Sequence, residues 1–162
     1  MCSIKSGFQF INYKVDSINL KMNNTVGMLA SVTNRDEDWK FKYGISQPLY
    51  ITEDDIYISS TSVTAFLGDE IRPHLKLDTS VSGIFKYFGS DKPKDIDSFV
   101  KIQMPAILSP YLRSAITYIL AMAGFGQVIP PLVNFRQMAN ELLKDKHILI
   151  QKDGKILGNN DN

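Results

Sequence analysis

Apolar and polar residues alternate with a period of two along much of the chain, the pattern of strands with one buried face. Residues 8–22 alternate in three blocks, and each change of phase moves the apolar side chains to the other face. Such phase changes predict bulges or twist points in one long strand. Residues 39–46 place Trp39, Phe41 and Tyr43 on one face and lysines on the other, which predicts a second strand.

Three more segments favour strands. A strand is expected at residues 26–33, before a charged turn at residues 34–38. Residues 55–67 are rich in β-branched and aromatic residues, and residues 74–85 alternate cleanly between apolar or threonine side chains and polar ones. Because only short turns separate these strands, with no helix between them, the sheet is expected to be antiparallel.

The last third of the chain changes to a helical period. Apolar residues between 107 and 123 recur at spacings of one, three and four, which gives a wide apolar helix face. Gly124 is a candidate C-cap. A loop rich in glycine, proline and apolar residues follows at 125–133. Asn134 can cap a second helix, which is expected at 135–144.

Strands followed by helices predict an α+β fold. We expect one domain at residues 1–146 and a polar, mobile tail at 147–162. The chain has 162 residues, of which 44% are hydrophobic and 22% charged, as in an ordinary globular domain. The net charge of +1 indicates no nucleic-acid footprint.

No charged residue occurs between Ser114 and Phe135, a length that would suit a membrane helix. Glycines and prolines at positions 124, 126, 130 and 131 divide this stretch, so no membrane insertion is expected. The first ten residues lack the apolar segment of a signal peptide, which favours the cytoplasm.

Candidate catalytic or metal-binding residues are few. His74 and His147 have no partners at metal-ligand spacing, and Cys2 is the single cysteine. The acidic clusters at residues 36–38 and 53–55 flank predicted strands and are interpreted as solvated turns, with a paired-carboxylate site as the alternative. We therefore expect no enzyme activity, no metal and no cofactor.

The segment Pro105–Arg113 reads Pro-Ala-Ile-Leu-Ser-Pro-Tyr-Leu-Arg. It resembles the start of the long helix in the SecB export-chaperone family, where the pattern is Pro-x-Ile-Leu-Phe-Pro-Tyr-Ala-Arg. The similarity continues to Pro130–Phe135, which resembles the family's Leu-Ala-Pro-Val-Asn-Phe. Shorter matches precede it in the same order, including the segment Val63–Glu70.

This resemblance implies a four-stranded antiparallel sheet followed by two C-terminal helices. It implies a homotetramer built as a dimer of dimers. The implied activity is ATP-independent holding of non-native polypeptides in long apolar grooves, as in protein export.

Apolar loop residues are unusual, since loops are normally polar. Those of the 125–133 loop either pack against the protein's own sheet or a partner subunit, or line a cleft for client polypeptides, and the two roles are compatible. Trp39 matches a family tryptophan near the groove but would equally suit the core. The candidate peptide-binding residues are Trp39, Ile107, Leu108, Tyr111, Phe125, Val128, Ile129, Leu132 and Val133.

In the SecB family, acidic residues on the outer face of the sheet contact the translocase motor SecA. Asp78 matches one of them and Asp16 lies near another. Lys21 stands where an acidic residue is expected, and Lys76 replaces an apolar contact residue. A positively charged motor surface should bind this face less well.

Two alternatives therefore stay open beside an export role. One is a SecB-like chaperone of a toxin–antitoxin system, which protects an aggregation-prone antitoxin. The other is a scaffold or assembly subunit that is not a chaperone, whose apolar loop is buried in an oligomer.

Overall fold

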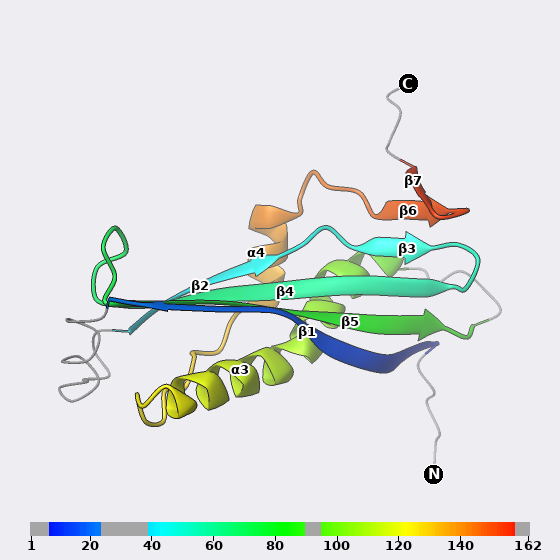
Figure 1. Ribbon diagram of the computed structural model, residues 1–162. Helices are drawn as coiled ribbons and strands as arrows, with labels where there is room; N and C mark the ends of the chain where they lie inside the picture. The colour runs from blue at the N-terminus through cyan, green and yellow to red at the C-terminus, as the bar shows by residue number, and fades with distance from the viewer. Residues whose placement is uncertain (1–6, 24–38, 90–94, 158–162) are drawn as a thin grey trace, which may run out of the picture.

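The computed structural model describes residues 7–23, 39–89 and 95–157. The strand expected at 26–33 and the charged turn at 34–38 lie outside these residues. One twisted sheet dominates the fold (Figure 1). Its strands are β1 (Phe8–Met22), β2 (Trp39–Ile45), β3 (Leu49–Ile51), β4 (Ile56–Leu67), β5 (Leu75–Tyr87), β6 (Leu149–Lys152) and β7 (Lys155–Leu157).

The order across the sheet is β1-β5-β4-β3-β6-β7, and β2 pairs with the part of β4 that β3 leaves free. The pairings among β1, β5, β4 and β2 are antiparallel, as predicted. The register of β1 against β5 shifts between Phe10 and Asn12 and again between Val15 and Ser17. These are the places where the apolar pattern changes phase, so the predicted bulges are confirmed.

The prediction of four strands followed by two C-terminal helices is wrong in two respects. First, the sheet has seven strands, one of which, β6, pairs in parallel with β3. Second, the helices are not the last elements, because the β6–β7 hairpin follows α4. This hairpin lies within residues 147–162, where we expected a polar tail. Its turn consists of Asp153 and Gly154, both at positive φ, as a tight two-residue hairpin turn requires.

The helices follow β5. Short α2 (Ile96–Ser98) and a π-helical turn, η2 (Phe99–Gln103), lead into the long helix α3 (Met104–Met122). Helix α3 ends at the predicted place, and Gly124 follows it with a φ of 91°. Helix α4 (Phe135–Leu142) begins with Asn134, whose side chain accepts a hydrogen bond from the backbone N–H of Gln137. This cap confirms the predicted start of the second helix.

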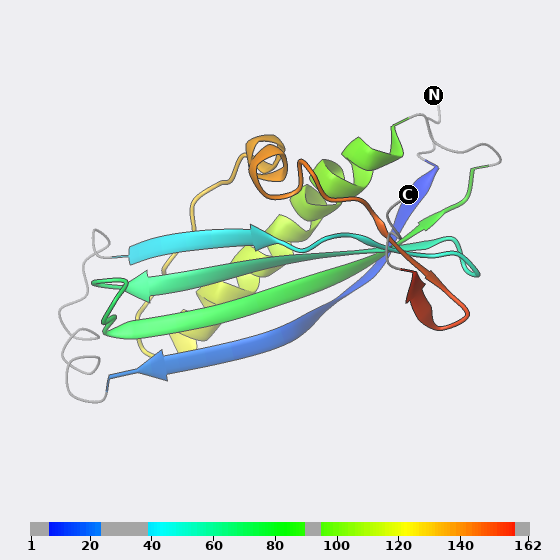
Figure 2. The ribbon, with the colours of Figure 1, turned by 90° about the horizontal axis from the view of Figure 1, so that it is seen from above.

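The core lies between α3 and one face of the sheet, here called the helix face. From Leu75 to Phe85, alternate residues of β5 are buried or glycine and face α3. Leu108, Leu112, Ile116 and Leu120 of α3 pack against them with no more than 1% of their surface exposed. Seen from above, α3 runs behind β4 and β5 (Figure 2). No described helix covers the opposite, outer face of the sheet.

Candidate functional site

The loop at residues 125–133 is fastened to the body of the protein through its backbone carbonyls. The Thr117 hydroxyl donates to the Val128 carbonyl at 2.9 Å, and Nε of Arg113 donates to the Pro130 carbonyl at 3.0 Å. From the other side, the Tyr43 hydroxyl of β2 donates to the Pro131 carbonyl at 2.9 Å. The loop is therefore held in a single path between α3 and β2.

Tyr43 remains a hydrogen-bond donor over the neutral pH range. Burial raises the pKa of the Tyr43 hydroxyl, and the nearby charge of Arg113 acts in the opposite direction. Arg113 is the single charged residue of α3, and its guanidinium is already bonded to the loop. Helix α3 thus contributes one positive charge, that of Arg113, to the surface around the loop.

Side chains of the loop divide between the core and the surface. Phe125 and Val128 are buried, and the Phe125 ring meets Trp39 edge-on with the ring centroids 5.8 Å apart. In contrast, Ile129 is 59% exposed and Leu132 is 83% exposed. The anchored backbone presents these apolar side chains to solvent.

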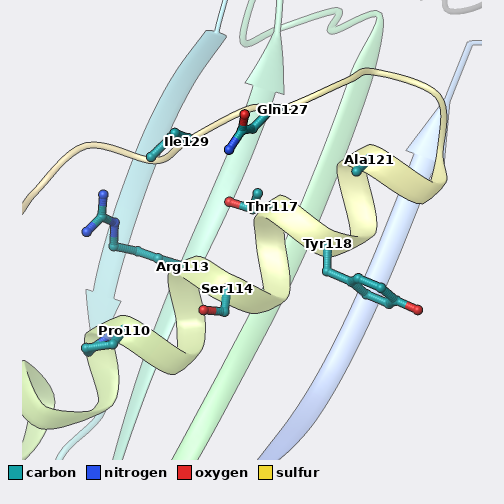
Figure 3. Close-up of a pocket in the computed structure, with 8 residues that line it drawn as sticks. All are labelled: Pro110, Arg113, Ser114, Thr117, Tyr118, Ala121, Gln127 and Ile129. Carbon is teal, nitrogen blue, oxygen red and sulfur yellow. The ribbon is translucent and has the colours of Figure 1, made fainter.

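Two pockets flank the loop. The first, of about 720 Å³, lies between the loop and the outward side of α3 (Figure 3). Arg113 reaches from α3 toward the loop, whereas Tyr118 extends away from it. The lining is Pro110, Arg113, Ser114, Thr117, Tyr118, Ala121, Gln127 and Ile129.

The second pocket, of about 420 Å³, lies between the loop, β2 and α4. Leu132 and Val133 contribute to it from the loop, Tyr43 from β2, and Met138 and Leu142 from α4. Ile129 thus lines the first pocket, and Leu132 and Val133 line the second. We call Ile129, Leu132, Val133 and the two pockets the loop surface.

A second exposed apolar surface lies on the other flank of α3. Strand β1 forms one edge of the sheet, and its helix-face residues pair with the buried residues of β5. From Tyr13 to Met22 the helix-face residues of β1 are themselves 37–53% exposed. The group, here called the β1 stripe, is Tyr13, Val15, Ile18, Leu20 and Met22.

The ring contacts between β1 and α3 lie at the Tyr13 end of the β1 stripe. Tyr111 stacks on Tyr13 with ring centroids 4.1 Å apart, and Phe10 lies 5.6 Å from the same Tyr111 ring. Ile107 shares this side of α3, because residues four apart lie on one helix face. The alternation of residues 8–22 predicted that the side chains of the β1 stripe share one face of a strand. The alternation does not show whether another element covers that face.

The structure distributes the nine candidate peptide-binding residues over three environments. Leu108, Phe125 and Val128 belong to the core, and Trp39 packs against it half-buried. Ile129, Leu132 and Val133 lie on the loop surface. Ile107 and Tyr111 lie beside the β1 stripe. Sequence reasoning missed Tyr43, Met138 and Leu142, which the structure adds to the loop surface.

The residues expected on a SecA-type face all project from the outer face of the sheet. Lys21 and Lys76 stand directly opposite each other on β1 and β5. Asp78 pairs with the Lys76 ammonium at 3.1 Å and accepts from the Thr64 hydroxyl at 2.7 Å. Asp16 accepts from the Ser82 hydroxyl and lies 3.6 Å from the Lys14 ammonium. Both carboxylates are thus engaged within the protein.

Residues 53–55 form the turn between β3 and β4, as predicted. Among residues 7–23, 39–89 and 95–157, no group of three His, Cys, Asp or Glu side chains could hold a metal ion. In the same part of the chain, no helix is long and apolar enough to cross a membrane.

Comparison with known proteins gives one family and several solved structures of similar fold. The family model of SecB, preprotein translocase subunit SecB, matches residues 22–146. The β6–β7 hairpin lies beyond that match. No curated protein matches the sequence.

Among solved structures, the fold is similar to that of the Mycobacterium tuberculosis Rv1957 SecB-like chaperone, in complex with a ChAD peptide from the Rv1956 HigA1 antitoxin. The TM-score is 0.56 at 10% identity, with 78% of this chain and 90% of that chain covered. A protein of unknown function from Streptococcus agalactiae gives a TM-score of 0.42 at 8% identity, covering 77% of this chain and 97% of that one.

Proposed function

The chain belongs to the SecB family, and from this premise we propose that it is an ATP-independent holding chaperone for non-native polypeptides. The observation that carries the proposal is the loop surface. It presents exposed Ile129 and Leu132 from a backbone that three hydrogen bonds hold in place. A preorganised apolar surface loses little conformational entropy when a client binds.

The proposed binding mode is repeated weak apolar contact. Full burial of one Leu or Ile side chain contributes about 1.5–3 kcal/mol before the costs of ordering the client are subtracted. A single pocket therefore binds a client weakly, and a long unfolded chain that reaches several pockets binds tightly. Of the nine candidates, Ile129, Leu132 and Val133 make the direct contacts, and Trp39, Phe125 and Val128 support the loop from beneath.

The proposal includes assembly into a homotetramer, a dimer of dimers that works in the cytoplasm. Assembly is supported by the apolar side chains that remain exposed on a single chain. The residues of the β1 stripe are 37–53% exposed, and Tyr118 and Met122 on α3 are 66% and 72% exposed. Exposed patches of this kind typically mark interaction sites. Contacts between subunits would cover them and extend the client grooves.

The test is suppression of aggregation. A chemically unfolded protein that aggregates on dilution is refolded with and without a substoichiometric amount of this chain, and light scattering is followed in the absence of ATP. We expect suppressed scattering that ATP does not change. Full scattering at equimolar chain would contradict the holding activity.

A second candidate role is protection of an antitoxin rather than service to the export motor. Two observations favour it. Lys21, Lys76 and the engaged carboxylates of Asp16 and Asp78 leave the outer face poorly suited to a positively charged motor surface. The Rv1957 chaperone, whose fold is similar, is seen with an antitoxin peptide.

Calorimetric titration of this chain with SecA separates the two roles. We expect no salt-sensitive binding if the antitoxin role is correct. Tight binding to SecA that weakens with salt would instead assign the chain to export.

A further inference from the structure

Charge is segregated between the two faces of the sheet. Strands β1, β2, β4 and β5 contain six lysines and two aspartates, a net charge of +4, although the whole chain carries only +1. Every one of these charged side chains belongs to the outer face, because the helix-face positions of the four strands are apolar, hydroxyl or glycine.

Four of the lysines gather at one end of this face. Lys21, Lys76, Phe66 and Lys40 follow one another in register across β1, β5, β4 and β2. The ammonium groups of Lys76 and Lys42 lie 5.9 and 5.7 Å from the centroid of the same Phe66 ring. We call Lys21, Lys40, Lys42 and Lys76 the lysine row.

One pair within the lysine row opposes the stability of the sheet. Lys21 and Lys76 stand directly opposite each other, and like charges in that position are destabilising. Two carboxylates of the described residues partly offset the row, with Glu70 at 2.5 Å from Lys42 and Asp78 at 3.1 Å from Lys76. Among the described residues, no carboxylate forms an ion pair with Lys21 or Lys40.

We propose that the lysine row is a docking site for an acidic, extended polypeptide segment of a partner protein, separate from the apolar surfaces that hold clients. Strands lie about 4.8 Å apart, so the row spans about 14 Å, the length of about four extended residues. A segment with two or three carboxylates over that length meets Lys21 and Lys76 at one end and Lys40 at the other. Complementary charge across such a surface sets specificity and speeds association.

The probe for the test is fluorescein-labelled decaglutamate, and its binding is followed by fluorescence anisotropy with the full chain. We expect binding at about 50 mM salt that weakens at least about tenfold at about 300 mM salt, where exposed charges are screened. Replacement of Lys21→Gln together with Lys76→Gln should weaken binding at least about fivefold, because two of the four cations are removed.

A matched control has the same change in charge elsewhere. Lys152→Gln with Lys155→Gln alters two exposed lysines of the β6–β7 hairpin and should leave the affinity within about twofold. An equal loss in this control would mean that bulk charge alone attracts the probe, which overturns the proposal. Absence of any decaglutamate binding also overturns it.

Three further measurements separate peptide docking from a role of the row in folding, in client holding or in nucleic-acid binding. The midpoint of urea unfolding of the Lys21→Gln, Lys76→Gln variant should equal or exceed that of the parent, because a like-charge pair is relieved. Its suppression of client aggregation should be unchanged, so a failure of the holding activity and a failure of this proposal are distinguishable. A short duplex DNA that binds more tightly than decaglutamate, and is lost with the same two lysines, would assign the row to nucleic acid and overturn the peptide proposal.

The chain's own acidic run provides the last comparison. Asp36, Glu37 and Asp38 precede β2 in the sequence. Neutralising them as Asp36→Asn, Glu37→Gln and Asp38→Asn should leave decaglutamate affinity unchanged. If decaglutamate binds only after this change, the occupant of the row is this chain itself and not a partner.

Discussion

Helix α3 has two flanks, and the chain treats them differently. On one flank, the loop at 125–133 covers the space between α3 and β2, and three hydrogen bonds fix its backbone. On the other flank, the residues of the β1 stripe stay 37–53% exposed, although Tyr111 stacks on Tyr13. The loop surface is formed within one chain, whereas the β1 stripe is the partly exposed edge of the sheet face that α3 buries at β5.

The contrast is sharpest between residues that pair in register. Leu20 of β1 and Leu77 of β5 stand opposite each other on the helix face. Leu77 is fully buried under α3, and Leu20 is 37% exposed. Since the two residues are identical, their difference in burial comes from their positions: Leu77 lies under α3 with a strand on either side, whereas Leu20 lies on the edge strand.

The largest expected effect therefore tests this pair. Leu77→Ala should lower the free energy of unfolding by about 2–5 kcal/mol, the usual cost of a cavity in a packed core. Leu20→Ala should cost less than about 1.5 kcal/mol in the dilute monomer, because part of its surface is already in water. Urea unfolding at several protein concentrations measures both.

The same pair also tests assembly. If subunits cover the β1 stripe, Leu20→Ala should raise the protein concentration at which oligomers form in sedimentation velocity, and Leu77→Ala should affect stability at every concentration. Identical oligomerisation of the Leu20→Ala variant and the parent would remove the β1 stripe from the subunit interface.

The next effect concerns the loop surface. Ile129→Asp together with Leu132→Asp should weaken client binding at least about tenfold, or about 1.4 kcal/mol, because charges replace exposed apolar contacts. Fluorescence titration with an unfolded client measures it. The matched control is Ile156→Asp with Leu157→Asp, an exposed apolar pair on β7. Equal losses in both variants would argue against a localised client site.

A smaller effect should follow from releasing the loop without changing its surface. Thr117→Val removes the hydrogen bond to the Val128 carbonyl and keeps the shape of the side chain. It should cost about 0.5–1.5 kcal/mol, and hydrogen exchange should accelerate within 125–133 more than within β5. Unchanged exchange in the loop would mean that Arg113 and Tyr43 are sufficient to hold it.

The smallest effect lies at the β6–β7 hairpin, far from both flanks. The backbone N–H of Asp153 donates to the Glu53 carboxylate and lowers the pKa of Glu53 below its ordinary value of 4.5. The ionised carboxylate thus stabilises the hairpin fully at pH values above 4.5. This stabilisation is lost as the pH falls through the lowered pKa of Glu53. Acid should therefore lower the protection factor of the Asp153 amide, which is its exchange rate corrected for the intrinsic pH dependence of amide exchange, and Glu53→Gln should abolish this loss of protection. Exchange in α3 is the internal reference.

Local signals in the sequence predicted most of the elements. The long strands follow from alternation, and the two bulges of β1 follow from its phase changes. Gly124 marked the end of α3 and Asn134 the start of α4. Both could be identified because a cap residue interacts with backbone groups only a few positions away in the sequence. Strand β3 was missed because three residues are too few to show an alternating pattern. The β6–β7 hairpin was missed although Asp153-Gly154 is a typical sequence for a two-residue hairpin turn.

The candidate site was less accessible to sequence reasoning. Alternation marks which side chains share a face but does not say whether another element lies over it. Leu108 and Ile107 are neighbours on one helix, yet one is core and the other is exposed, and Tyr43 joins the loop across 88 positions of sequence. The sequence by itself determined the periods, the caps and the family motif. Only the tertiary structure decided that β1 is an edge strand and that the lysines align into one row, because both depend on contacts between distant segments.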